Sequence, residues 1–223
     1  MKIVMINGSH RKNGTTAAIL NALYRELEKY HDVEVQLFHV ADLSLNYCVG
    51  CGRCYKMGNC IYKDDAERLS SELESADGII LGSPTYAANV SAQMKTIIDR
   101  GHLVMEQLLY GKYAVTVTTY ENYGGRESAK ILNRLLAHSG AKISGTIIFK
   151  KKNDWRVSGR QRLDAHVKEV AGTLYQDIRV KRKYVFQSLR QLIIFKVGIK
   201  PFIIKNEAQY AGVIRCWERK NIN

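Results

Sequence analysis

Residues 3–16 read IVMINGSHRKNGTT, and this stretch decides the fold. Its first four residues are apolar and strand-like, a polar loop with two glycines follows, and an amphipathic segment begins at Thr15. Such a loop directs backbone N–H groups, hydroxyls and the Arg11 guanidinium toward a helix N-terminus, where the helix dipole favours an anion. The stretch therefore fits a phosphate site, although it fits an ordinary strand-to-helix turn as well.

The rest of the chain repeats this alternation of strand and helix. Further strands are expected at 33–40, 78–81, 113–119 and 143–149, and helices at 15–30, 64–76, 91–104, 129–136 and 163–174. Five strand–helix units in register predict an α/β protein with a doubly wound, five-stranded parallel sheet and helices on both faces. We expect this domain to span 1–178, with a basic, helical C-terminal extension over 179–223.

In such a sheet, ligands bind at the carboxyl ends of the strands, beside the point where the strand order reverses. The loops after the first, third and fourth strands are therefore expected to meet. Their candidate binding residues are Ser9, Arg11, Gly14, Thr15, Thr16, Pro84, Thr85, Tyr86, Asn89, Thr119, Tyr120, Gly124 and Gly125. The first loop suits a phosphate and the other two suit a flat heterocycle, which together suggest a mononucleotide. Each of the later loops, taken singly, also fits an ordinary turn.

Residues 8–16 and 82–86, together with Met94-Lys95 and Asp99-Arg100, resemble the flavodoxin-fold NAD(P)H-dependent FMN reductases. With its cysteine-rich loop, residues 47–60 inserted after the second strand, the chain is most similar to the iron–sulfur flavoprotein branch of that family. The resemblance covers roughly residues 1–178.

This resemblance implies a flavodoxin-like fold in which the three loops hold FMN. The phosphate would lie on residues 9–16 and the isoalloxazine ring against 84–89 and 119–125. It also implies a homodimer or homotetramer, because a neighbouring subunit builds part of the flavin site in such reductases. His10 and Thr15 depart from the Pro and Asn common in relatives, and Tyr120 and Glu121 stand where small residues are usual.

Cys48, Cys51, Cys54 and Cys60 form the pattern C-x2-C-x2-C-x5-C. Four thiols in one loop suit a bound metal, and the spacing is similar to compact cysteine runs that hold [4Fe–4S] clusters, as the family resemblance also implies. Zinc, which usually takes two separated CxxC knuckles, ranks second, and a disulfide ranks third in a reducing compartment. Free thiols stay an alternative. Cys216 is expected to be a small buried side chain.

The net charge of +13 comes from the C-terminal part of the chain. Residues 1–149 hold 16 Lys and Arg against 15 Asp and Glu, whereas residues 150–223 hold 18 against 6. We interpret 179–223 first as an arm that packs on another subunit. An anionic membrane surface, an acidic ferredoxin-like donor and nucleic acid are alternatives, the last without a recognition motif. No long apolar run or signal-like start is present, so we expect a cytoplasmic protein.

The sequence thus predicts a flavin-dependent oxidoreductase that passes electrons between FMN and a [4Fe–4S] cluster, with NAD(P)H or a ferredoxin-like protein as donor. No residue stands out as a catalytic acid or base, and the histidines fall in unrelated contexts. Two alternatives remain: an NAD(P)H-dependent FMN or quinone reductase without a cluster, and a flavodoxin-like electron carrier without turnover of a small molecule. No separate dinucleotide fingerprint identifies the donor.

Overall fold

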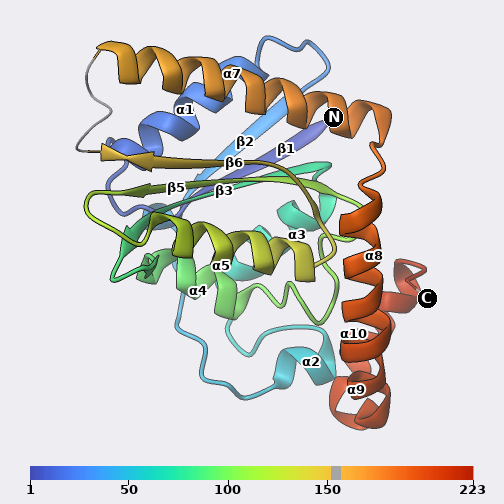
Figure 1. Cartoon of the computed structure of the whole chain (residues 1–223). Helices are drawn as coiled ribbons and strands as arrows, with labels where there is room; N and C mark the ends of the chain where they lie inside the picture. Colours follow the sequence, from blue (N-terminus) through green and yellow to red (C-terminus); the bar gives the residue numbers. More distant parts are fainter. Residues whose placement is uncertain (152–156, 223) are drawn as a thin grey trace.

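Figure 1 shows the computed structural model, which describes residues 1–151 and 157–222. Five parallel strands lie in the order β2-β1-β3-β5-β6, and a short β4 pairs antiparallel with the end of β3. The strands are β1 Lys2–Asn7, β2 Glu34–His39, β3 Gly78–Tyr86, β4 Asn89–Val90, β5 Tyr113–Tyr120 and β6 Lys142–Lys150. The predicted flavodoxin-like parallel sheet is confirmed. The two-residue β4 was not predicted, because so short a strand carries no periodic signal.

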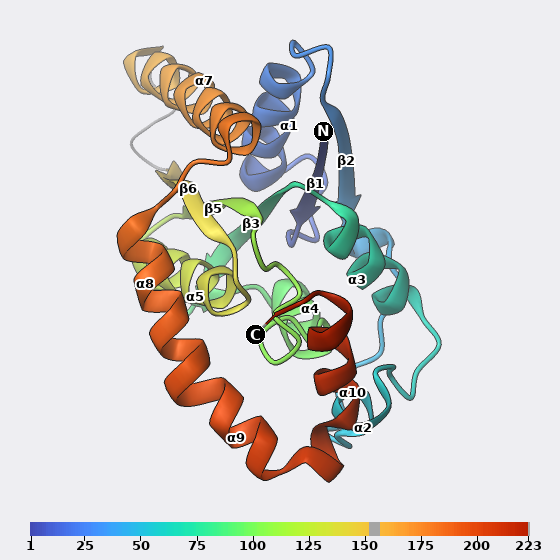
Figure 2. The same ribbon diagram turned by 90° about the vertical axis from the view of Figure 1, so that its right-hand side faces the viewer.

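Helices cover both faces of the sheet. The helices of the described chain are α1 Thr15–Leu27, η1 Val40–Asp42, α2 Arg53–Met57, α3 Asp65–Ser75, α4 Ala92–Arg100, α5 Gly125–His138, α7 Val157–Val180, α8 Val185–Ile193, η2 Ile194–Ile199, α9 Lys200–Lys205 and α10 Glu207–Arg219. α1 and α7 lie on one face and α3, α4 and α5 on the other (Figures 1 and 2). Each face has its own apolar core, because the apolar residues of each helix recur at helical spacing toward the sheet.

After α7 the chain forms a C-terminal arm, residues 181–222. α8, η2 and α9 form a long rod along an outer edge of the molecule, and α10 then turns back toward α2 (Figure 2). The arm has a small core of its own, made of Phe195, Ile203, Val213, Trp217 and Ile222. The predicted helical extension is therefore present. Among the described residues, no helix has both the length and the apolar character needed to cross a membrane.

α10 packs closely on α2, which lies inside the cysteine-rich loop. The rings of Tyr55 and Tyr210 stack with their centroids 5.3 Å apart. Arg215 donates hydrogen bonds to two carbonyl oxygens of α2, both at 3.3 Å. A Cβ on Gly212 would lie only 2.3 Å from the backbone nitrogen of Gly58. The C-terminal arm therefore supports the segment that carries the cysteines.

Gly212→Ala should lower the free energy of unfolding by about 1–3 kcal/mol, because the new methyl group would push α10 away from the backbone of Gly58. Gly198→Ala in the same arm is the matched control, since a Cβ there meets nothing within 4 Å. That control should be neutral or stabilising by up to about 1 kcal/mol. Urea unfolding followed by tryptophan fluorescence measures both values, and equal effects would contradict the close contact.

A buried ion pair joins α3, α4 and the start of the cysteine-rich loop. Arg100 Nη2 lies 2.8 Å from Asp64 Oδ1, and the two side chains are only 2% and 4% exposed. Arg100 also donates to the carbonyl oxygen of Asn46, and Asp64 caps α3 by accepting from the backbone N–H of Ala66. Burial raises the pKa of the Asp64 carboxyl, but hydrogen bonds from Arg100, Asn46 and Ala66 outweigh it and hold the pKa well below its ordinary value.

Asp64→Asn should lower the free energy of unfolding at pH 7 by about 3–5 kcal/mol, because it leaves the buried Arg100 charge uncompensated. A folded-state pKa below the unfolded value gives stability that is present above about pH 4 and is lost as the pH falls. The difference between wild type and variant should therefore shrink below about pH 4 in urea unfolding at a series of pH values.

The control for this series is Asp99→Asn, which removes an exposed pair with Lys95. It should change stability by less than about 1 kcal/mol. A wild-type advantage over Asp64→Asn that stays constant down to pH 2 would show that the carboxylate charge is not what stabilises this region.

Candidate functional site

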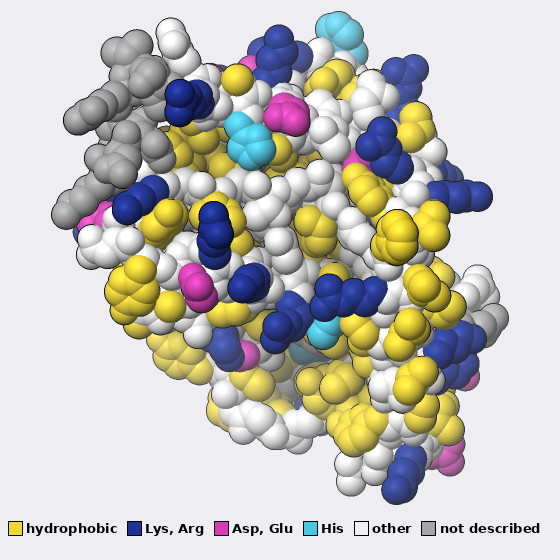
Figure 3. Space-filling model, in the orientation of Figure 1, with side chains coloured by type: hydrophobic (Ala, Val, Ile, Leu, Met, Phe, Trp, Pro, Cys, Tyr) yellow, Lys and Arg dark blue, Asp and Glu magenta, His cyan; other side chains and the backbone are white. Residues whose placement is uncertain are grey.

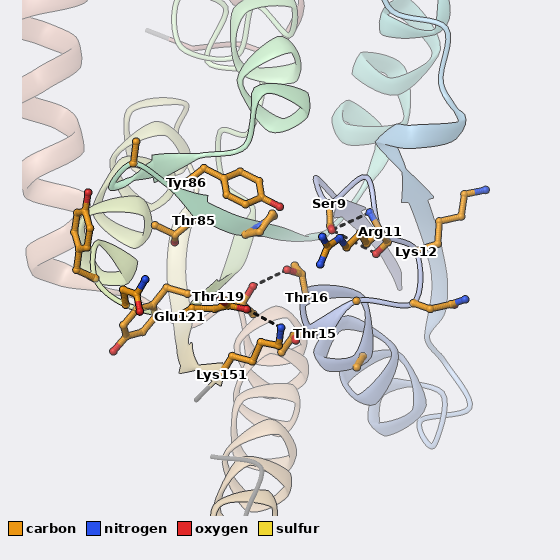
Figure 4. Close-up of a pocket in the computed structure, with 18 residues that line it drawn as sticks. Ser9, Arg11, Lys12, Thr15, Thr16, Thr85, Tyr86, Thr119, Glu121 and Lys151 are labelled. Carbon is orange, nitrogen blue, oxygen red and sulfur yellow. Dashed lines mark hydrogen bonds and ion pairs between the residues drawn. The ribbon is translucent and has the colours of Figure 1, made fainter. Parts of the chain in front are cut away.

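A hollow of about 900 Å³ opens at the carboxyl ends of β1, β3 and β5 (Figure 4). This volume is in the range of small-molecule sites. Ten of the thirteen predicted binding residues line it: Ser9, Arg11, Gly14, Thr15, Thr16, Pro84, Thr85, Tyr86, Thr119 and Tyr120. The three loops that were expected to meet therefore do so. Asn89, Gly124 and Gly125 are not among the lining residues.

One end of the hollow suits an anion. α1 begins after Gly14, which offers no capping side chain, and the first turn of the helix holds no acidic residue. Its first N–H groups are therefore available to a ligand at the positive end of the helix dipole. Ser9 Oγ accepts from the backbone N–H of Arg11 at 3.1 Å, which shapes the loop, and the Thr16 and Thr119 hydroxyls are 2.7 Å apart across the hollow.

The other end of the hollow offers aromatic and polar groups. Thr85 Oγ1 is buried and has no hydrogen-bond partner in the part of the chain that the structure describes. Tyr86, the next residue, is 59% exposed, and its ring points into the hollow on the side toward Ser9 (Figure 4). Lys151 Nζ lies 2.6 Å from Glu121 Oε1 at the rim. A buried hydroxyl without a partner is costly unless a ligand atom completes it.

The three predicted residues outside the lining hold the surrounding loops. Asn89 Oδ1 accepts from the N–H of Val90 at 2.8 Å within β4, directly after the turn that follows β3. Gly124 lies against Ala88 and Gly125 against the ring of Tyr120, so these glycines let the loop after β5 pack on its neighbours. Eight further residues line the hollow without having been singled out. Six of them fall within the ranges 9–16, 84–89 and 119–125 that the resemblance implied: Lys12, Asn13, Ala87, Glu121, Asn122 and Tyr123. Ala18 and Lys151 lie outside those ranges.

The cysteine-rich loop lies elsewhere in the molecule, below the sheet and around α2 in Figure 1. Cys48 and Cys51 are exposed, and Cys54 and Cys60 are half-buried. Within residues 1–151 and 157–222, no group of three or more His, Cys, Asp or Glu side chains is arranged to hold a metal ion. The four cysteines therefore share one loop but are not gathered around a point. Cys216 is buried, as expected, and burial raises the pKa of its thiol.

Two side chains that can carry positive charge, Arg100 and His102, face this loop. The sequence alone predicted no role at the cysteines for either of them. Arg100 contacts Cys60, and His102 contacts Cys54. Burial lowers the pKa of His102, but interactions with Cys54 and Glu106 outweigh it and raise the pKa to about 10. No local pattern signals these contacts, because they join segments far apart in the sequence.

Comparison with known proteins identifies relatives of this chain. Residues 1–155 match the family model described as NADPH-dependent FMN reductase. An iron–sulfur flavoprotein of Clostridioides difficile (strain 630) is 34% identical over 226 residues, which cover 100% of both chains. An iron–sulfur flavoprotein of Archaeoglobus fulgidus is 42% identical over 141 residues, 61% of this chain and 62% of that protein.

Solved structures agree on the fold. An NADH:FMN oxidoreductase in its apo form superposes with a TM-score of 0.57 and 19% identity, over 78% of this chain and 89% of that chain. The family match spans more than half of the residues, and the relative from C. difficile is similar over its whole length. This chain therefore belongs to the NADPH-dependent FMN reductase family, within its iron–sulfur flavoprotein branch.

Proposed function

We propose that this FMN-binding oxidoreductase holds its flavin in the hollow at the ends of β1, β3 and β5 and exchanges electrons with a [4Fe–4S] cluster on the cysteine-rich loop. The observation that carries the flavin site is the combination, in one hollow of about 900 Å³, of an uncapped α1 N-terminus and a buried Thr85 hydroxyl to which no described group bonds. FMN supplies two-electron chemistry and the cluster supplies one-electron chemistry, so together they would convert one into the other.

The chain's own residues would bind and orient the flavin. Arg11 and the first N–H groups of α1 would hold the phosphate, because they combine a full positive charge with the helix dipole. Thr85 Oγ1 would bond a polar atom of the ligand, and the Tyr86 ring would lie against its planar part. Since no acid or base is needed for electron transfer, the protein's role is position and electrostatics.

The cysteine-rich loop fits a cluster by its donor chemistry. Cys48, Cys51, Cys54 and Cys60 would be the four thiolate ligands, and the Arg100 and His102 side chains interact with two of them, Cys60 and Cys54. None of the cysteines lines the hollow. We therefore infer that the protein works as a homodimer or homotetramer, in which the loop of one subunit can approach the flavin of another.

A second candidate is an NADPH-dependent FMN or quinone reductase without a cluster. The observation in its favour is that the cysteine side chains of the described chain are not gathered into a metal site. Iron and acid-labile sulfide measured on protein purified without oxygen separate the two candidates. About four irons per chain fit the first, as a [4Fe–4S] cluster requires, whereas FMN without iron supports the second.

Arg11→Gln should weaken FMN binding by about 10- to 100-fold, because a hydrogen bond between charged groups contributes about 1.5–3 kcal/mol. Quenching of flavin fluorescence on titration with apoprotein measures the affinity. Arg25→Gln is the control, since it removes the same charge from an exposed position near the other end of α1. It should change the affinity by less than about twofold. Equal weakening in both variants would contradict a phosphate contact at Arg11.

Cys54→Ala should lower the iron and sulfide content of anaerobically purified protein while FMN binding stays intact, because the cysteines lie outside the hollow. Cys216→Ala removes a buried thiol outside the cysteine-rich loop and should leave the iron content unchanged. If wild type and both variants hold the same amount of iron, this loop is not the cluster site.

A further inference from the structure

α8 exposes its apolar side to solvent, unlike an ordinary surface helix. Its apolar side chains normally face the core, but here Val185, Phe186, Leu189, Leu192 and Ile193 are all 51–88% exposed. At 100° per residue these five lie within one third of the helix circumference. They therefore form a continuous apolar stripe that no other described segment covers.

The polar side of the same helix faces the protein. Gln187 donates to the carbonyl oxygen of Ile143 at 3.0 Å and accepts from its N–H at 2.8 Å. One turn further on, Gln191 donates to the carbonyl oxygen of Ala141 and also contacts the amino group of Lys142. Three hydrogen bonds to backbone thus fix which way α8 faces, and the outward direction of the apolar stripe follows from them.

The apolar stripe continues along the rod. Val197 is 73% exposed, Phe202 49% and Ile204 48%. The helical rod from Val185 to Lys205 is about 30 Å long and runs along an outer edge of the molecule (Figure 2). Figure 3 shows hydrophobic side chains gathered along this edge with Lys and Arg among them. A contiguous apolar surface of this kind marks an interaction site.

The charge of the rod and of the segment just before it identifies the kind of partner. Residues 178–206 have eight Lys and Arg and no Asp or Glu, and four of the eight lie in the rod itself: Arg190, Lys196, Lys200 and Lys205. A helix with large apolar residues on one side and basic residues beside them is typical of segments that lie in the interface of an anionic bilayer. In a two-fold contact, a second copy would bring the same stripe with the same charges, and facing like charges costs several kcal/mol.

We propose that the apolar stripe of α8 and α9 is a docking surface for an anionic lipid bilayer, on which the rod lies flat. The apolar side chains would enter the boundary between headgroups and acyl chains. Lys181, Lys183, Lys196 and Lys205, all exposed, would meet the lipid phosphates. This inference does not depend on the cluster or on the identity of the electron donor, and it takes up the anionic membrane surface that the sequence analysis left as an alternative to a subunit arm.

The test is co-sedimentation of the full-length, FMN-loaded protein with vesicles. Wild type should bind vesicles of phosphatidylcholine mixed with phosphatidylglycerol, should not bind phosphatidylcholine alone, and should dissociate as salt screens the charges. Phe186→Ser combined with Leu189→Ser should lower the partition coefficient at least about tenfold. Lys181→Gln and Lys183→Gln should each lower it about fivefold.

Tyr110→Ser is the matched control, because Tyr110 is 59% exposed but lies outside the arm. It should bind vesicles like wild type, and equal FMN content in all variants shows that they are folded. The mass of each variant without lipid is measured by analytical ultracentrifugation. The proposal is overturned if wild type does not bind anionic vesicles, or if Phe186→Ser with Leu189→Ser breaks up a wild-type oligomer, since the stripe would then belong to a second copy.

Discussion

One hydrogen bond at the carboxyl ends of β1 and β3 sets the geometry of the hollow. The N–H of Gly8 donates to the carbonyl oxygen of Gly82 at 2.8 Å, and the hydroxyl of Ser91 donates to the carbonyl oxygen of Gly8 at 2.6 Å. Ser91 also caps α4, so two strands and a helix are joined at one point. Because the strand order reverses there, the loops that follow diverge and leave a space between them. A side chain at position 8 would fill the room that Met94 occupies.

Much of this arrangement could be predicted from the sequence, because it depends on local patterns. Buried parallel strands are continuous apolar runs, and the helices between them repeat apolar residues at helical spacing. The loops of the hollow follow from the strand ends. The exceptions are informative. Asn89 was expected to line the hollow, but it lies in β4 instead. The turn before it places Ala87 and Ala88 in the left-handed region, with φ angles of 48° and 57°. No pattern of residue types in the sequence predicts such a turn.

Contacts between distant segments could not be predicted in this way. The apolar residues of α8 recur at helical intervals, as in an amphipathic helix, but this pattern does not say whether the apolar side faces the protein or the solvent. Only the hydrogen bonds of Gln187 and Gln191 to backbone decide between them. Similarly, His102 carried no sign of its neighbour Cys54, because the turn after α4 and the cysteine-rich loop meet only once the domain is folded.

The contact between α10 and α2 also imposes an order in time. The ribosome makes Gly58 about 150 residues before Gly212, which at roughly 5–20 residues per second amounts to about eight to thirty seconds. During that interval the cysteine-rich loop lacks the helix that packs on it. The loop therefore reaches its mature conformation only after α10 has been made and has packed on it, and any group inserted before then would be covered by that helix.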